Sequence, residues 1–171
     1  MRRLGPLALA TLSLLFLGIA LPAGDAVGQQ TTLKAQLIGT WTFVSSTGKF
    51  PDGSPVWGSN PKGLVIFTEN GRYASLLMRS DRPKFASNNR MQGTPDENKA
   101  TAQGTISSFG TYAVNEANKT YTIRFEGSSY PNREGTDQTR PFTITGDELR
   151  VTNPAPSAGG PSSQLVYKRA K

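Results

Sequence analysis

The sequence predicts an all-β domain of eight antiparallel strands that closes into a barrel, with one short helix and a cleavable signal peptide before it. Apolar and polar residues alternate in short runs, which is the pattern of half-buried strands. Turn residues such as Asn70-Gly71 and Gly146-Asp147 separate neighbouring runs, as tight hairpins require. An antiparallel sheet of this size can close on itself and lose its edges, and a sandwich of two sheets is the alternative.

A targeting segment is expected at residues 1–28. Arg2 and Arg3 precede an uncharged apolar run over residues 7–20, and small residues follow it. The run is too short for a membrane span, which needs about 20 apolar residues. We therefore expect cleavage after Gly28, or alternatively after Ala26, no stable membrane anchor after cleavage, and a periplasmic or secreted protein.

The strands are expected in two series on either side of one helix. Thr94 can cap that helix, Pro95 suits its first position, and Glu97 can reach back to complete a capping box. Its end is expected near Gln103, before Gly104. The expected strands are Thr40–Ser46, Gly63–Thr68, Arg72–Arg79, Phe109–Val114, Thr120–Glu126, Asp137–Thr145, Glu148–Thr152 and Gln164–Lys168.

Two missing residue types narrow the chemistry. The chain has no cysteine, and so no disulfide and no thiol nucleophile. It also has no histidine, which excludes a Ser-His dyad, a histidine-bound haem and an ordinary zinc site. We expect no metal and no cofactor. The formal net charge of +7 suits an anionic partner but is also ordinary for an exported protein.

Several segments together resemble the lipocalin-like domain family of bacteria and fungi. They are LIGTWTFVS, NPKGLVIFTENGRYASLLMR, DRPKFASNNRMQGTPDENKA, GTYAV and FEGSSYPNREGTDQTRPFTITGDELRVTNP, and they place the domain at residues 37–171. The resemblance implies a lipocalin-like barrel with a mouth at one end. It implies no particular ligand, because a fold does not fix a function.

Two arginines are the strongest polar candidates. Arg79 has the same strand parity as Tyr73 and Leu77, and Arg140 has the parity of Phe142. An arginine that faces a barrel interior needs a partner, since an isolated buried charge is costly. One interpretation is an ion-pair cluster with Glu134 or Asp137, and the other is a clamp for a ligand carboxylate.

A polar loop supplies further candidates. Tyr130 and Asn132 suit the entrance of an apolar cavity, or alternatively hold a demanding turn. Trp41 is expected in the core near the closed end and Trp57 at the rim. The expected ligand-binding residues are Tyr73, Leu77, Arg79, Phe125, Tyr130, Asn132, Asp137, Arg140 and Phe142. The expected cavity wall consists of Leu64, Ile66, Tyr73, Leu77, Ile123, Phe125, Phe142 and Ile144.

Three functions are compatible with these residues. The first is a non-enzymatic barrel that binds a small apolar or amphipathic molecule, which is anionic if the arginines contact it. The second is a cofactor-free isomerase or cyclase that uses Tyr, Asp or Glu with Arg. The third is a filled barrel that acts through its outer loops. Nucleic-acid binding is not expected, because the aromatic residues alternate inward.

Overall fold

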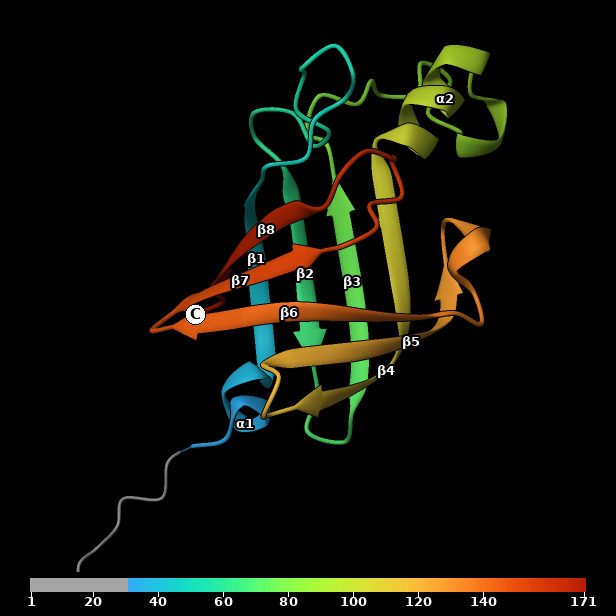
Figure 1. Cartoon of the computed structure of the whole chain (residues 1–171). Helices are drawn as coiled ribbons and strands as arrows, with labels where there is room; N and C mark the ends of the chain where they lie inside the picture. The colour runs from blue at the N-terminus through green and yellow to red at the C-terminus, as the bar shows by residue number, and fades with distance from the viewer. Residues whose placement is uncertain (1–30) are drawn as a thin grey trace, which may run out of the picture. The chain divides into compact units, whose positions relative to one another are not determined.

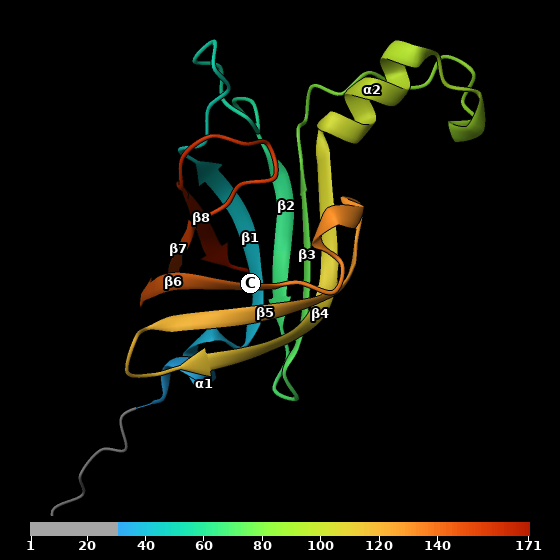
Figure 2. The ribbon, with the colours of Figure 1, turned by 45° about the vertical axis from the view of Figure 1, so that its right-hand side comes forward.

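The computed structural model describes residues 31–171, and the expected signal peptide lies outside these residues. Eight strands pair in chain order, each antiparallel to the next, and β1 pairs with β8 to close the barrel. Figures 1 and 2 show the closed sheet from two sides. The strands are β1 Gly39–Ser46, β2 Lys62–Phe67, β3 Arg72–Met78, β4 Thr105–Asn115, β5 Thr120–Ser128, β6 Asp137–Thr145, β7 Glu148–Asn153 and β8 Ser163–Arg169.

The helix expected after Thr94 is confirmed as α2, Pro95–Gln103. The Thr94 hydroxyl accepts from the Glu97 backbone N–H at 3.3 Å, and the Glu97 carboxylate accepts from the Thr94 N–H at 2.8 Å. This reciprocal pair is the expected capping box. The helix buries no residue and stands out from the open end of the barrel (Figure 2).

A second short helix was not expected from the sequence. It is α1, Leu33–Leu37, and it covers the opposite end of the barrel (Figure 1). Thr32 caps its first turn, and the Glu116 carboxylate accepts from the Leu33 and Lys34 backbone N–H groups. Leu37 is fully buried. A single turn bearing one buried residue has too little periodicity to be recognised in a sequence.

The two ends of the barrel differ. At the end covered by α1 the strands are joined by short turns, over residues 68–71, 116–119 and 146–147. Trp41 is fully buried here, as expected, and its indole N–H donates to the Leu37 carbonyl at 2.8 Å. The guanidinium of Arg169 lies 4.1 Å from the Trp41 ring centroid. The other end carries the long connections over residues 47–61, 79–104, 129–136 and 154–162.

Aromatic rings fill much of the interior. Phe67 lies at the centre of this packing, with ring centroids 5.0 Å from Tyr112, 5.2 Å from Tyr121 and 5.7 Å from Tyr73. Tyr121 in turn packs against Phe142 at 5.5 Å. Phe67 and Tyr121 are at most 2% exposed, so side chains of the protein itself occupy this part of the barrel.

The predicted facing of β2 was wrong. Val65 and Phe67 are the buried residues of this strand, and Leu64 and Ile66 alternate with them on the outer face. Leu64 pairs with Leu76, which is exposed, whereas Phe67 pairs with the buried Tyr73. The strand is apolar on both faces, so its composition gives no alternation from which to choose the inner set. Among residues 31–171, no helix is long and apolar enough to cross a membrane.

Candidate functional site

A buried arginine is the main polar feature of the interior. Arg140 comes from the middle of β6, where strand alternation turns it into the barrel, and it is only 5% exposed. The Gln138 side-chain oxygen accepts from its Nε at 2.8 Å and from its Nη2 at 2.6 Å. The Gln138 amide nitrogen donates to the Asn153 side chain and to the Ala155 carbonyl, at 3.3 Å and 3.2 Å. Gln138 therefore fixes the position of the guanidinium without neutralising it.

The expected acidic partners of Arg140 lie elsewhere. Asp137 pairs with Arg124 at 3.2 Å, and Glu134 accepts from the Ser128 backbone N–H at 3.1 Å. Asp137 is three residues from Arg140, an odd number, so the pleat places the two side chains on opposite faces of the sheet. None of the ion pairs within residues 31–171 includes Arg140.

Three tyrosines interact electrostatically with the guanidinium of Arg140, namely Tyr73, Tyr121 and Tyr167. Burial raises the pKa of Tyr121 to about 12, against the opposing effect of the Arg140 charge. Burial also raises the pKa of Tyr167 well above its ordinary value. Both hydroxyls therefore stay protonated at neutral pH and leave the positive charge of Arg140 uncompensated.

A second arginine lies close by. Arg133 belongs to a single 3₁₀ turn, Pro131–Arg133, between β5 and β6, and its guanidinium lies 5.4 Å from the Phe125 ring centroid. Burial lowers the pKa of Arg133, and the charge of Arg140 lowers it further. Two positive groups thus repel each other in a poorly hydrated place, and a negative group between them would relieve this repulsion.

A cavity of about 40 Å³ lies beside both arginines at the open end. Its walls come from strands β1, β3, β4, β6, β7 and β8, from the 3₁₀ turn Pro131–Arg133 and from the loops over residues 47–61 and 154–162. No Asp or Glu of the described chain lines it. The lining includes Tyr73, Leu77, Ile106, Ser108, Arg133, Arg140, Asn153, Ser157 and Leu165, together with Val56 and Trp57. The arrangement suits a small anionic group that is partly surrounded by apolar side chains.

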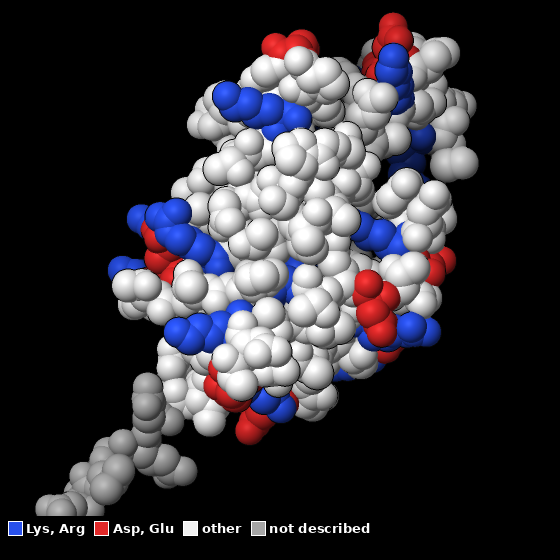
Figure 3. Space-filling view, viewed as in Figure 1, with Lys and Arg blue, Asp and Glu red and all other residues white. Residues whose placement is uncertain are grey.

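Charges on the outside are distributed unevenly. In the face shown in Figure 3, most charged side chains lie near the edges, and the middle is largely uncharged. The ion pairs Arg124–Asp137 and Arg150–Glu148 each have side chains that are at least one-third exposed. Water screens such surface pairs well. Arg140, in contrast, is 5% exposed and is shielded from this screening.

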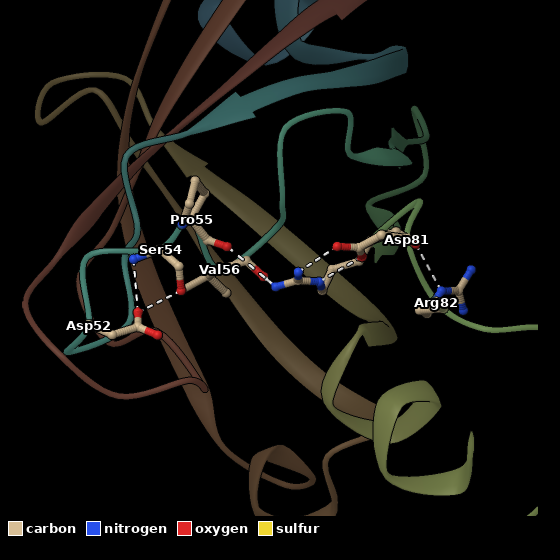
Figure 4. Close-up of polar contacts among 7 residues, drawn as sticks. Asp52, Ser54, Pro55, Val56, Asp81 and Arg82 are labelled. Atoms are coloured by element: carbon tan, nitrogen blue, oxygen red, sulfur yellow. Dashed lines mark hydrogen bonds and ion pairs between the residues drawn. The ribbon is translucent and has the colours of Figure 1, made fainter. Parts of the chain in front are cut away.

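The expected inward position of Arg79 was wrong. β3 ends at Met78, and Arg79 pairs with Asp81 through its Nε at 2.9 Å and its Nη2 at 2.6 Å. Its Nη1 donates to the carbonyls of Pro55 and Val56 at 3.4 Å and 3.3 Å (Figure 4). Once the strand has ended, its alternation no longer fixes the direction of the next side chain. Arg79 braces the loop that carries Val56 instead of lining the cavity.

The other expected ligand-binding residues are divided among three places. Tyr73, Leu77 and Arg140 line the cavity. Phe125 and Phe142 belong to the buried core. Tyr130 and Asp137 lie along an open groove outside the barrel, which Phe125 also reaches. Asn132 is exposed in the 3₁₀ turn and lines neither the cavity nor this groove.

Two polar residues at the site were missed in the sequence. Gln138 is two residues before Arg140, so strand alternation alone places both on the inner face, and this signal was available. Arg133 gave no such signal, because it lies in an irregular segment without periodicity. Its position depends on how residues 129–136 fold back over Phe125.

The comparisons with known proteins give one match. No curated protein is significantly similar to the chain in sequence. The sequence model of a family described as a lipocalin-like domain matches residues 38–170, which is most of the chain. This match agrees with the closed eight-stranded antiparallel barrel, a fold that generally suits small-molecule binding. The chain therefore belongs to the family of lipocalin-like domains.

Proposed function

We propose that the protein binds a small organic acid, with the carboxylate of the ligand at Arg140. The observation that carries this proposal is the buried guanidinium of Arg140, which borders a cavity and is held by Gln138 without a carboxylate partner. A buried charge is stabilised when an opposite charge with good hydrogen-bond geometry reaches it. A carboxylate matches the planar fork of an arginine and makes a short, charge-assisted contact.

The size of the cavity limits what enters it. Whole drug-sized ligands occupy roughly 300–1,000 Å³, and the cavity measures about 40 Å³. At 10–15 Å³ for each water molecule, it holds roughly three waters, which is similar to one carboxylate group. The barrel is therefore too full to enclose a complete apolar ligand of the kind expected from the sequence. We infer that the acidic head enters the barrel and that the rest of the molecule stays outside.

The composition of the lining favours binding over the isomerase or cyclase alternative. Acid–base catalysis needs a group that accepts a proton near neutral pH. The cavity has no Asp or Glu among its described lining residues, and burial raises the pKa of Tyr121 to about 12. Tyr121 lies beside Arg140 behind the cavity wall, and its hydroxyl stays protonated at neutral pH. The hydroxyl and guanidinium groups of the described residues that line the cavity can donate hydrogen bonds to an anion, and none of them is a carboxylate that could take a proton from a substrate.

Two probes of the same shape test the proposal. Benzoate and the uncharged benzamide should be titrated into the ¹⁵N-labelled domain and followed by amide chemical shifts. We expect benzoate alone to shift the amides of Ile106 and Ser157 in a saturable manner. Arg140→Met should weaken benzoate binding at least tenfold, which corresponds to the loss of one charge-assisted contact of about 1.5–3 kcal/mol.

The matched control is Arg150→Met. Arg150 pairs with Glu148 on the surface and does not line the cavity, so this variant loses the same charge without changing the site. Benzoate affinity should stay within about twofold of the parent, since an exposed charge contributes little to a distant site. Equal benzoate affinity in the parent and in Arg140→Met would rule the proposal out.

We also propose that the protein acts outside the cytoplasm, as a periplasmic or secreted protein. The support comes from residues 1–28, where Arg2 and Arg3 precede an apolar run and then small residues. N-terminal sequencing of the protein recovered from its own host should begin at Gln29, or at Val27 if Ala26 is the cleavage site. A recovered chain that still begins at Met1 would contradict export by cleavage.

A further inference from the structure

An open groove of about 540 Å³ runs along the outside of the barrel next to the cavity. One of its walls comes from the start of β6 and the 3₁₀ turn before it, and the other comes from the loop over residues 154–159. Arg133, Pro156 and Ser157 line both the groove and the cavity. The two spaces are thus separated only by the thickness of these side chains.

Arg133 forms much of the wall between the groove and the cavity. Its guanidinium lies over the Phe125 ring at 5.4 Å, and Phe125 borders the groove. Burial and the neighbouring Arg140 both disfavour its charge and lower its pKa. An acid that approaches along the groove therefore meets Arg133 first and Arg140 deeper inside.

The chemistry of the groove suits a flat ring better than a flexible chain. Tyr130 offers an aromatic side chain that is 39% exposed, and Pro154 and Pro156 offer rigid rings on the facing loop. Thr136 and Thr139 provide hydroxyl groups between these apolar surfaces. Stacking on rigid rings loses little conformational freedom, whereas an ordered acyl chain would lose much of its own.

The one acidic residue of the groove limits the charge of the ligand. Asp137 lies at the groove and is paired with Arg124 on the sheet surface. Arg124 already pairs with the Asp137 carboxylate. Among the described residues, Arg133 is the one cationic residue that lines the groove, so a second negative charge on the ligand would have no further cation to contact there. The groove therefore favours an uncharged ring behind a single acidic head.

We propose that the ligand is a ring-bearing monocarboxylic acid whose ring lies in the outer groove against Tyr130 while its carboxylate passes Arg133 to reach Arg140. This inference rests on the proposed function and adds the class of ligand and its direction of entry. The ligand enters from the side of the barrel, between the 3₁₀ turn and the loop over residues 154–159. It does not enter through the mouth below α2.

Three carboxylic acids used as probes distinguish binding in the groove from binding of the carboxylate at Arg140 alone, the head site. Acetate tests the head alone, 2-naphthoate adds a rigid ring system, and octanoate adds a flexible chain. Tyr130→Ala should weaken 2-naphthoate binding about tenfold, the loss expected for one aromatic contact, and should leave acetate within twofold. Tyr130→Phe keeps the ring and should restore 2-naphthoate affinity. Met91→Ala removes a side chain that is 79% exposed on another loop, and it should have no effect.

Amide chemical shifts distinguish the two directions of entry. Binding of 2-naphthoate should shift the amides of Thr136 and Thr139 beyond the changes that acetate causes, and it should leave Phe50 and Lys99 unchanged. If Tyr130→Ala leaves 2-naphthoate affinity unchanged, or if the additional shifts fall on Phe50 and Lys99, the inference is wrong while the head site stands. If none of the three acids binds, the proposed function and the inference are both wrong.

Discussion

Arg140 carries a buried charge that no carboxylate of the described residues neutralises. Arg140 is 5% exposed, and Gln138 Oε1 accepts from its Nε and its Nη2. A group kept in this state costs stability in the absence of a ligand and becomes favourable when an anion arrives. Buried charges held by a neutral partner are typical of functional sites, which is why the proposed function is built on Arg140.

Arg140→Met is therefore expected to leave the domain as stable as the parent or more stable. Removing an uncompensated buried charge gains roughly 1–3 kcal/mol, and Gln138 loses two hydrogen bonds at a cost of roughly 1–2 kcal/mol. Urea unfolding without added ligand measures the balance. A free energy of unfolding more than about 2 kcal/mol below that of the parent would show that the fold itself needs the charge.

Tyr121 makes stability depend on pH in the alkaline range. Burial raises its pKa in the folded protein to about 12, above its ordinary value of 10.0. The native state therefore keeps a proton that the unfolded chain releases, so stability is full below pH 10 and falls as the pH rises towards about 12. A shift of this size corresponds to roughly 3 kcal/mol in total.

Unfolding by urea at pH 9, 10 and 11 tests this effect against Tyr121→Phe, which has no group to ionise. The parent should lose stability more steeply than the variant over this range. A smaller slope should remain in the variant, because burial also raises the pKa of Tyr167. Identical slopes in the two proteins would show that Tyr121 does not titrate in this way.

At the scale of elements, the connections between strands determine which residues reach the site. The hairpin after β2 and the helix after Thr94 could be predicted, because turn dipeptides and capping boxes act within a few residues. All eight strands could be predicted as well, because the alternation of apolar and polar residues is also a local pattern. The predicted start of β4 was wrong, since this strand begins at Thr105 rather than at Phe109. Arg140 and Gln138 share a face through strand alternation alone.

The rest of the site depends on contacts that no local pattern records. Arg133 reaches the cavity because residues 129–136 fold back, and Arg79 leaves it because β3 ends one residue earlier. The facing of β2 could not be predicted either, since Leu64 and Val65 are equally apolar. These three features are decided by long-range packing, and periodicity in a single sequence does not report on it.

The loop over residues 47–61 is expected to loosen in Arg79→Ala. The Arg79 side chain holds the Pro55 and Val56 carbonyls, and its loss removes two hydrogen bonds of about 1 kcal/mol each at most. Hydrogen exchange of the Val56 and Gly58 amides should accelerate about five- to tenfold, with global stability changed by less than about 1 kcal/mol. The matched control is Arg124→Ala, which breaks an exposed pair with Asp137 and should leave these amides unaffected.

At the scale of the whole molecule, the barrel places its tightest packing and the proposed binding site at opposite ends. The closed end holds α1, the fully buried Trp41 and the Arg169 side chain that crosses it. Arg169 donates to the Ile38 and Gln36 carbonyls at 3.2 Å and 2.9 Å. The open end holds the long loops, the cavity and the interior arginines. The stability contributed by the packed end therefore offsets the cost of burying the Arg140 charge in the rest of the barrel.

Arg169→Met and Arg140→Met should have opposite effects on the two properties. Arg169→Met loses two hydrogen bonds, a cation–π contact and an exposed ion pair with Asp147 that contributes little. We therefore expect a loss of roughly 2–3 kcal/mol in the free energy of unfolding, with unchanged benzoate affinity. Arg140→Met should keep its stability and lose benzoate binding. The two residues share no hydrogen-bond partner, so their effects in the double variant should add within about 0.5 kcal/mol. Stability effects that depart from additivity by 1 kcal/mol or more would mean that the two ends are coupled through the packed rings between them.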